Sequence, residues 1–215
     1  TLNMKNILCL LVFVGFSYYA SAQESNSYKE QIKIEKNENP VYELGYIELR
    51  TIFPFVLGNH FLNEAYSQDV AGFDMYVNIY KIHDFRIGFG LTRFGSSLTD
   101  ASLAGNFKRA NYRSYYAQVG YVVYQNKVFE TGITAGYGYN YFRQITRGER
   151  IGSYNTGELR AGVFSRYQFG RNFGLSFGVN YLTSNKDIKN AGLNSGLFDR
   201  IHVLNAFIGF YINFE

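Results

Sequence analysis

The chain of 215 residues contains 20 Tyr, 20 Phe and 22 Gly, but only 2 Pro and no Trp, and its formal net charge is +4. A positive charge this small and this dispersed argues against nucleic acid as a partner. Abundant aromatic residues and glycine with little proline favour an all-β chain over a helical one.

The N-terminal residues predict a cleaved signal peptide. Lys5 precedes Ile7–Phe16, an apolar segment too short to span a bilayer as a helix, and Ala20-Ser21-Ala22 supplies the small residues of a cleavage site. We therefore expect residues 1–22 to be upstream residues and signal peptide, and residues 23–40 to be a short polar leader. The alternative is that the apolar segment forms a buried first strand or helix.

Eight segments follow in which large apolar side chains alternate with small or polar ones. In the longest run, Ile133 and Tyr137 fall on one face, whereas Glu130 and Asn140 fall on the other. A period of two residues is the period of a β-strand. The expected strands are Tyr42–Phe55, Phe73–Ile82, Phe85–Phe94, Tyr112–Tyr124, Val128–Tyr141, Glu158–Phe169, Phe173–Leu182 and Ile201–Phe214.

The connections between these strands alternate in length. Short turns are expected at His83-Asp84, at Asn126-Lys127 and at Gly170-Arg171-Asn172. An even number of strands with short turns at one end and long loops at the other is typical of an outer-membrane barrel, whose closure satisfies every backbone hydrogen bond. The long loops are expected at Gly58–Gly72, Gly95–Ala110, Gly148–Gly157 and Ser184–Phe198.

The sequence therefore predicts that residues 41–215 form an all-β, eight-stranded antiparallel up-and-down transmembrane β-barrel. Its termini would be periplasmic and its long loops extracellular. A secreted lipocalin-like barrel is the soluble alternative, but it would need an apolar interior and a polar outside. Here the apolar face is suited to acyl chains.

The second face of the strands carries charges that cannot point into lipid, where an arginine at the midplane costs ~2–4 kcal/mol. An eight-stranded barrel is just wide enough to be filled by its own side chains, so we expect a plugged polar interior with ion pairs. Inward glycines would leave room for the arginines. A gated proton or ion path through the same charges is the alternative. The expected interior residues are Glu48, Arg50, Asp74, Arg86, Gln118, Glu130, Asn140, Glu158, Arg160 and Arg166.

The C-terminus carries a further signal. Gly209, Ile212 and Phe214 fit a glycine–hydrophobic–aromatic ending that resembles the signal read by the outer-membrane barrel assembly machinery, although Ile208 and Glu215 depart from it. With its layout and inward charges, the chain resembles the small eight-stranded outer-membrane barrels of the outer-membrane protein X and outer-membrane protein A membrane-domain type. The resemblance implies the outer membrane of a Gram-negative cell envelope.

One segment is similar to the end of the outer-membrane lipid A deacylases, which carry a His-x-Ser-Asn motif. Ser184 and Asn185 match that motif, but Leu182 stands at the position of the histidine. A serine without a general base is a poor nucleophile, although His60 or His202 could replace the base in space. The sequence contains no metal-ligand spacing, phosphate loop or nucleophile elbow, so we expect no cofactor.

The loops predict the partners. Cationic side chains at the outer rim could pair with lipopolysaccharide phosphates, or they could be solvated. We expect a non-enzymatic protein with a structural or surface-interaction role, whose loops meet lipopolysaccharide, other cells or host molecules. A lipid A-modifying enzyme and a porin-like route for small molecules are the alternatives. The expected basic rim consists of Lys108, Arg109, Arg147, Arg150, Lys186 and Lys189.

Overall fold

The computed structural model describes residues 43–58, 61–100, 108–146, 149–185 and 200–214. The expected signal peptide and leader lie outside these residues. No helix among the described residues is long and apolar enough to cross a membrane. The elements are β1 (Glu43–Leu57), α3 (Phe61–Glu64), β2 (Tyr66–Gln68), β3 (Gly72–Ile82), β4 (Phe85–Leu98), β5 (Arg109–Gln125), β6 (Phe129–Thr146), β7 (Glu149–Gln168), β8 (Phe173–Asn185) and β9 (Arg200–Asn213).

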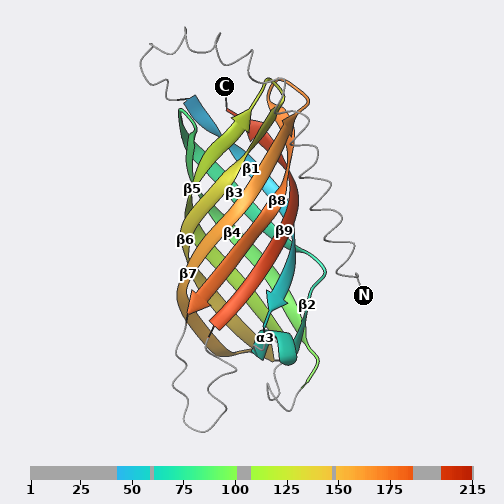
Figure 1. The fold of residues 1–215 in the computed structure, drawn as a ribbon. Coiled ribbons are helices and arrows are strands. Elements are labelled where there is room, and N and C mark those ends of the chain that lie inside the picture. The colour runs from blue at the N-terminus through green and yellow to red at the C-terminus, as the bar shows by residue number, and fades with distance from the viewer. Residues whose placement is uncertain (1–42, 59–60, 101–107, 147–148, 186–199, 215) are drawn as a thin grey trace. The chain divides into compact units, whose positions relative to one another are not determined.

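Within this part of the chain, eight strands close into an antiparallel barrel, and β2 is a short extra strand paired with β4 (Figure 1). Each long strand pairs with its neighbours in sequence, and β1 pairs with β9 from Tyr46↔Asn213 to Leu57↔His202 to close the ring. The predicted fold class is therefore confirmed. Closure leaves none of the eight strands as a free edge along the body of the barrel.

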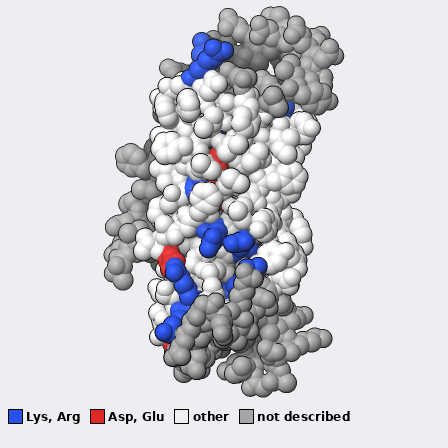
Figure 2. Space-filling model, turned by 180° about the vertical axis from the view of Figure 1, so that it is seen from behind, with Lys and Arg blue, Asp and Glu red and all other residues white. Residues whose placement is uncertain are grey.

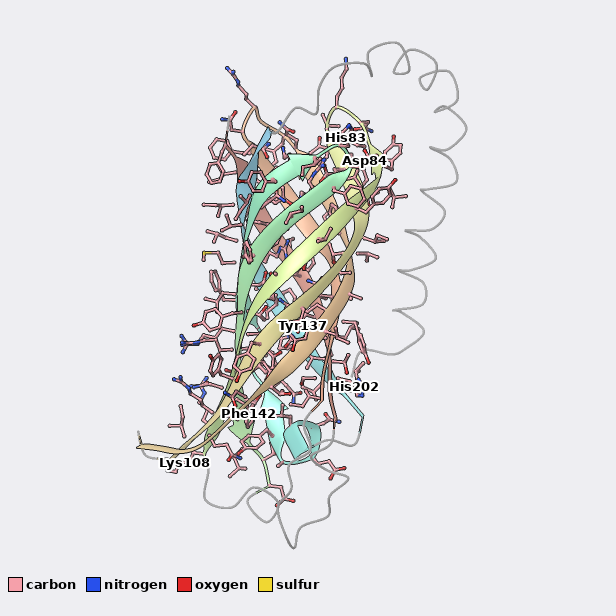
Figure 3. All side chains as sticks on the ribbon, turned by 90° about the vertical axis from the view of Figure 1, so that its left-hand side faces the viewer. His83, Asp84, Lys108, Tyr137, Phe142 and His202 are labelled. Carbon is pink, nitrogen blue, oxygen red and sulfur yellow. The ribbon has the colours of Figure 1, made fainter. Side chains whose placement is uncertain are left out.

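The two-residue period of the sequence becomes the two faces of the wall. Along β5, Tyr115, Val119 and Tyr121 are 48%, 45% and 42% exposed, whereas Tyr116 and Gln118 are buried. Large apolar side chains cover the outside of the other strands in the same way. Away from the loop end, the outer wall is consequently largely apolar and the inner face holds the polar residues; Figure 3 draws the side chains on the ribbon.

One end of the barrel, the turn end, carries the three short connections. His83 and Asp84 form the first, with His83 at a positive φ of 53°, and the Asn126 side chain accepts backbone hydrogen bonds across the second. The Phe214 N–H donates to the Gly45 carbonyl over 3.0 Å. The first and last strands of the barrel therefore begin and end at the turn end.

The opposite end, the loop end, corrects the sequence prediction. The expected loop Gly148–Gly157 is mostly strand, because β6 and β7 stay paired as far as Thr146↔Glu149. The expected loop Gly58–Gly72 contains α3 and β2. Polar and glycine-rich residues indicate a loop when they are read alone, but the ladder of a long hairpin satisfies their backbone groups and continues the strand. The strict alternation of long and short connections was therefore wrong.

Strand β1 shows how the wall changes near the loop end. It pairs with β3 as far as Ile52↔Gly72, and beyond that point its described strand partner is β9 alone. Pro54 lies in this last section. Proline has no backbone N–H to give to a ladder, so it fits a strand where one side is unpaired. Helix α3 and strand β2 lie beside this section of β1.

The interior is divided along its length. Charged and tyrosine side chains occupy the turn end and the middle, as the inward faces predicted. The loop end is instead filled by an apolar cluster that includes Ile52, Leu62, Phe94 and Phe142. Tyr66 belongs to this cluster, and burial raises the pKa of its hydroxyl although Gln144 donates a hydrogen bond to it.

Candidate functional site

The centre of the interior is an ion-pair network that begins at Glu48 on β1. Arg50, two residues further on the same inward face, places Nε and Nη2 each 2.7 Å from the two oxygens of the Glu48 carboxylate. Arg50 Nη1 lies 3.3 Å from Asp74 on the neighbouring strand β3. Arg166 reaches Glu48 from β7 with Nη2 at 3.4 Å. Because β7 and β1 are separated by two strands of the wall, this contact crosses the lumen.

A second branch of the network runs from Asp74 toward β7. The Asp74 carboxylate accepts hydrogen bonds from the Thr92 hydroxyl and from the Tyr116 hydroxyl, the latter at 3.0 Å. Arg160 Nη2 donates to Thr92 Oγ1 over 2.7 Å, and Arg160 Nε lies 3.2 Å from Glu158. Strands β7 and β4 are separated in the wall by β6 and β5, so this branch also crosses the lumen.

Glu158 ends this branch toward the loop end. Its carboxylate accepts a hydrogen bond from the Ser114 hydroxyl over 3.1 Å and another from the Asn140 amide over 3.4 Å. The residue is only 1% exposed. The sequence predicted that a strand starts at Glu158, but β7 begins at Glu149, so Glu158 lies well inside the strand.

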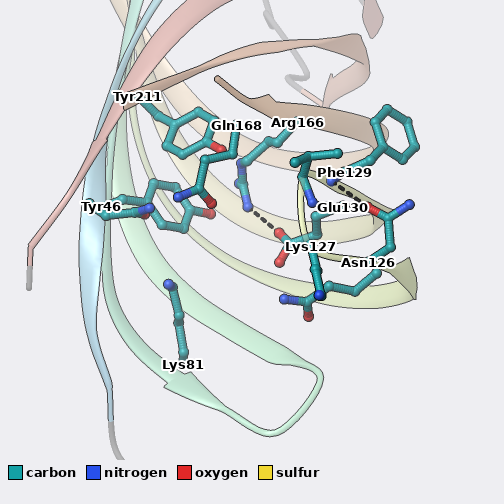
Figure 4. A pocket seen from close by; sticks show the side chains of 12 residues that line it. Tyr46, Lys81, Asn126, Lys127, Phe129, Glu130, Arg166, Gln168 and Tyr211 are labelled. Carbon is teal, nitrogen blue, oxygen red and sulfur yellow. Dashed lines mark hydrogen bonds and ion pairs between the residues drawn. The ribbon is translucent and has the colours of Figure 1, made fainter. Parts of the chain in front are cut away.

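Glu130 anchors the network at the turn end. Its two carboxylate oxygens lie 2.8 Å from Arg86 Nη2 and 2.6 Å from Arg166 Nη1. Glu130 and Arg166 border a pocket of about 90 Å³ that opens beside the Asn126–Val128 turn (Figure 4). The Glu130 side chain is 15% exposed, so it is the member of the network that meets water.

Four tyrosines on the inward faces of β1, β3, β5 and β9 form one buried cluster, of which Tyr46 and Tyr211 also line this pocket. The ring centroids of Tyr46 lie 6.0 Å from those of Tyr76 and of Tyr211, and Tyr76 stacks on Tyr116 at 6.3 Å. Arginines lie over these rings, with Arg160 Cζ 3.6 Å from the Tyr116 centroid. Cation–π contacts of this kind strengthen when water is excluded.

The space for these rings comes from inward glycines. A Cβ added at Gly90 would collide with the ring of Tyr116. The inward glycines had been expected to make room for arginines. At Gly90 the neighbour is an aromatic ring instead, and the arginine lies on the ring's face.

The structure places the ten expected interior residues on the inner side of the wall, and all except Glu130 are buried. The four carboxylates and four arginines among them give a formal charge of zero. Gln118 and Asn140 are 5% and 0% exposed. Thr92, Ser114 and the four tyrosines complete the network and were not expected as site residues, although their inward parity could have indicated them.

The basic rim is only partly described. Lys108 and Arg109 are exposed at the loop end, and Arg109 Nη2 lies 2.8 Å from Asp69. Arg150 belongs to β7, but its side chain lies outside the described residues. Arg147, Lys186 and Lys189 also lie outside them. Within the described residues, no group of three His, Cys, Asp or Glu side chains could hold a metal ion.

Ser184 does not meet the histidine that could activate it. Ser184 and Leu182 both lie on the inner face of β8 and are 4% and 1% exposed. His202 pairs in register with Thr183, and its Nδ1 contacts the Tyr181 hydroxyl at 2.5 Å. Ser184 and His202 therefore lie on opposite faces of the sheet and cannot form a nucleophile–base pair. His60 lies outside the described residues.

The three residues of the expected C-terminal assembly signal lie in two different environments. Ile212 and Phe214 are exposed on the apolar outer wall. Gly209 is buried against Arg50 of β1, at the seam that closes the barrel.

No protein-family model matches the chain, and no curated protein matches it by sequence. Among solved structures, the chain is similar to Neisserial surface protein A, with a TM-score of 0.56 and 16% identity over 79% of this chain and 96% of that one. It is similar to the outer membrane protein OprG of Pseudomonas aeruginosa, with a TM-score of 0.50 and 11% identity over 81% of this chain and 98% of that one. The outer membrane enzyme PagL gives a TM-score of 0.41 and 15% identity over 79% and 99%. The chain therefore has the fold of the small eight-stranded outer-membrane β-barrels.

Proposed function

We propose that this protein is a non-enzymatic outer-membrane barrel that presents its loop end to partners outside the cell. The observation that carries the proposal is an apolar wall around a neutral interior that is braced across the lumen. Exposed apolar surface of this extent marks a membrane or protein interface, and here it encircles the barrel. Proteins with this fold are found in outer membranes, which supports the location.

The orientation follows from the connections. Outer-membrane barrels keep their short turns on the periplasmic side and their longer loops outside. The turn end, with His83-Asp84 and both barrel termini, would face the periplasm. The hairpin of β6 and β7 would project from the outer surface, and Gly209, Ile212 and Phe214 would be read by the barrel assembly machinery during insertion.

The filled lumen supports a structural or surface-interaction role over the passage of solutes. Contacts from Arg160 to Thr92 and from Arg166 to Glu48 connect β7 to β4 and to β1 across the lumen, and the four tyrosines lie next to them. Lipopolysaccharide, other cells or host molecules would then be met at the outer surface, where Lys108 and Arg109 are exposed.

The enzymatic alternative is a lipid A deacylase, since an enzyme also uses this fold. Its chemistry would need a base beside Ser184, and the described histidine on the neighbouring strand faces the other way. Mass spectrometry of lipid A from cells with and without the protein separates the two functions. Unchanged acyl chains are expected. A lost acyl chain that returns with Ser184→Ala would establish the enzyme.

The location is tested by fractionation together with electrophoresis in detergent. The mature protein is expected in the outer-membrane fraction, with faster migration before boiling than after it. Recovery as a soluble periplasmic protein would refute the membrane proposal, whatever the lipid A analysis shows.

A further inference from the structure

Three arginines stand side by side on the outer wall near the loop end. Arg93 of β4 is paired in register with Arg113 of β5, and Arg143 of β6 pairs with Asn111, one outward position from Arg113. We call Arg93, Arg113 and Arg143 the arginine patch. Lys and Arg side chains gather on this face of the molecule, in the half toward the loop end (Figure 2).

The arginine patch is a costly arrangement if it has no ligand. Like charges directly opposite each other on neighbouring strands destabilise a sheet. Among the described residues, no carboxylate forms an ion pair with these three arginines, whereas nearby Arg109 is paired with Asp69 at 2.8 Å. The patch therefore presents uncompensated positive charge that an anion would neutralise.

The height of the patch on the wall points to the surface of a membrane. Along β5 the outward residues from Val123 to Tyr115 are exposed and largely apolar, and Arg113 is the next outward position. Ten residues of a tilted strand rise ~25 Å, which is the height of the apolar band in outer-membrane barrels. Arg113 thus lies where the acyl chains end and the headgroups begin.

Among the side chains that the structure describes, the arginine patch occupies one side of the barrel. Asn155 on β7 shares a register partner, Tyr141, with Arg113, and toward the loop end of β8, β9 and β1 the outward residues include Thr183, His202 and Leu57. None of them is a lysine or an arginine. Arginines that only had to contact the membrane surface could be spread around the barrel. Their clustering on three adjacent strands indicates a ligand bound at one place.

Guanidinium groups bind phosphate through paired, charge-assisted hydrogen bonds. Tyr115 and Tyr139 lie next to the arginine patch on its turn-end side. Both are exposed on the lipid-facing wall, so they offer apolar surface to the acyl chains of a lipid whose phosphate binds the arginines. Resting on the membrane location proposed above, we infer that Arg93, Arg113 and Arg143 form a binding site for the phosphorylated headgroup of an outer-leaflet glycolipid. On β5 this site lies further from the loop end than Lys108 and Arg109 of the expected basic rim, and it shares no residue with that rim.

The test uses the full mature chain, purified in detergent, with bisphosphorylated lipid A and dephosphorylated lipid A as probes. Native mass spectrometry reports the bound fraction of each. The wild type is expected to retain the phosphorylated lipid about tenfold or more better, because several charge-assisted hydrogen bonds are at stake. Equal retention of the two lipids by the wild type would overturn the inference without any variant.

The variants locate the site. Arg93→Gln/Arg113→Gln/Arg143→Gln is expected to abolish the preference for phosphorylated lipid A. Arg113→Lys is expected to weaken that preference, because lysine keeps the positive charge but lacks the paired N–H donors of the guanidinium group. Lys127→Gln, which removes an exposed charge at the turn end, is the matched control. A triple variant that binds like the wild type would overturn the site.

Two further arms identify the source of the anion. Inorganic phosphate and a sulfated polysaccharide are added as competitors at matched ionic strength. Neither is expected to displace the lipid, since neither contacts the apolar wall. If either competitor displaced the lipid completely, that competitor, and not a glycolipid, would be the ligand class of the site. Because the variants are also fractionated, a protein that reaches the outer membrane but lacks the preference refutes this inference alone.

Discussion

At the scale of single residues, Glu48 is the side chain on which the interior network most depends. Its carboxylate accepts hydrogen bonds from Arg50 on its own strand and from Arg166 across the lumen, and it is fully buried. A buried ion pair is tolerated when its geometry is good and its remaining groups are hydrogen-bonded, whereas a single buried charge without a partner is strongly unfavourable.

We expect Glu48→Ala to lower the free energy of unfolding by ~3–5 kcal/mol, because two buried arginines lose their shared counter-charge. Urea titration of the folded barrel in detergent micelles measures the change. Lys127→Ala, at an exposed turn position, is the control and should unfold like the wild type. A Glu48→Ala barrel with wild-type stability would mean that water, and not the carboxylate, compensates these arginines.

Glu130→Ala is expected to destabilise the barrel less than Glu48→Ala, although it also has two arginine partners. Glu130 borders the pocket at the turn end and is 15% exposed, so water can reach Arg86 and Arg166 once the carboxylate is gone. The same titration compares the two variants. A larger loss for Glu130→Ala would move the centre of the network to the turn end.

At the scale of elements, the seam between β1 and β9 is the junction that turns a sheet into a barrel. Arg50 and Gly209 are register partners there. A Cβ at Gly209 would collide with the Leu49 carbonyl oxygen and lie 2.9 Å from the Arg50 Cα. Because the obstacle is backbone, it cannot move aside as a flexible side chain would.

Gly209→Ala should therefore destabilise the folded barrel, by ~1–3 kcal/mol for an overpacked site. Gly170→Ala is the matched control, since its Cβ would meet nothing closer than 3.8 Å at the turn end. Refolding from urea into detergent, followed by the gel shift on boiling, reports both. Equal stability of the two variants would show that the β1–β9 seam can accommodate an additional methyl group.

The hairpin of β6 and β7 gives a second prediction at this scale. Their register continues through Phe142↔Tyr154 to Thr146↔Glu149, so these amides should exchange slowly with solvent. Hydrogen exchange in micelles should show slow exchange of Tyr154 and fast exchange of Lys127 in its exposed turn. Equally fast exchange at both positions would restore the loop that the sequence predicted.

At the scale of the whole molecule, the apolar wall and the closed interior serve different demands. The wall satisfies lipid, and the interior must neutralise its own charges, because an eight-stranded lumen has little room for water. Four carboxylates and four arginines achieve this, with contacts that cross the barrel in two places.

The purified protein is therefore expected to give no stepwise conductance in planar bilayers. Arg160→Ala/Tyr116→Ala removes one of the crossing contacts and one ring of the tyrosine cluster, and is expected to raise leakage if it folds. The wild type alone suffices for the test. Regular current steps in the wild type would show that the network opens.

The sequence by itself determined the number of barrel strands and the side of the wall on which each residue lies. Both follow from the two-residue period, which is a local property of an extended backbone. That is why the inward position of Glu130 and the outward position of Tyr137 could be read from one segment. The same local reading could not extend β7 through glycine-rich residues, because only the partner strand stabilises them.

Tertiary structure alone decided which inward charges meet and which outward charges gather. Glu48 and Arg166 are 118 residues apart, and their contact depends on the stagger of strands around a closed barrel. Arg93 faces Arg113 for the same reason, since the register of β4 on β5 is set across a long connection. Periodicity gives each side chain a face, but closure and register give it a neighbour.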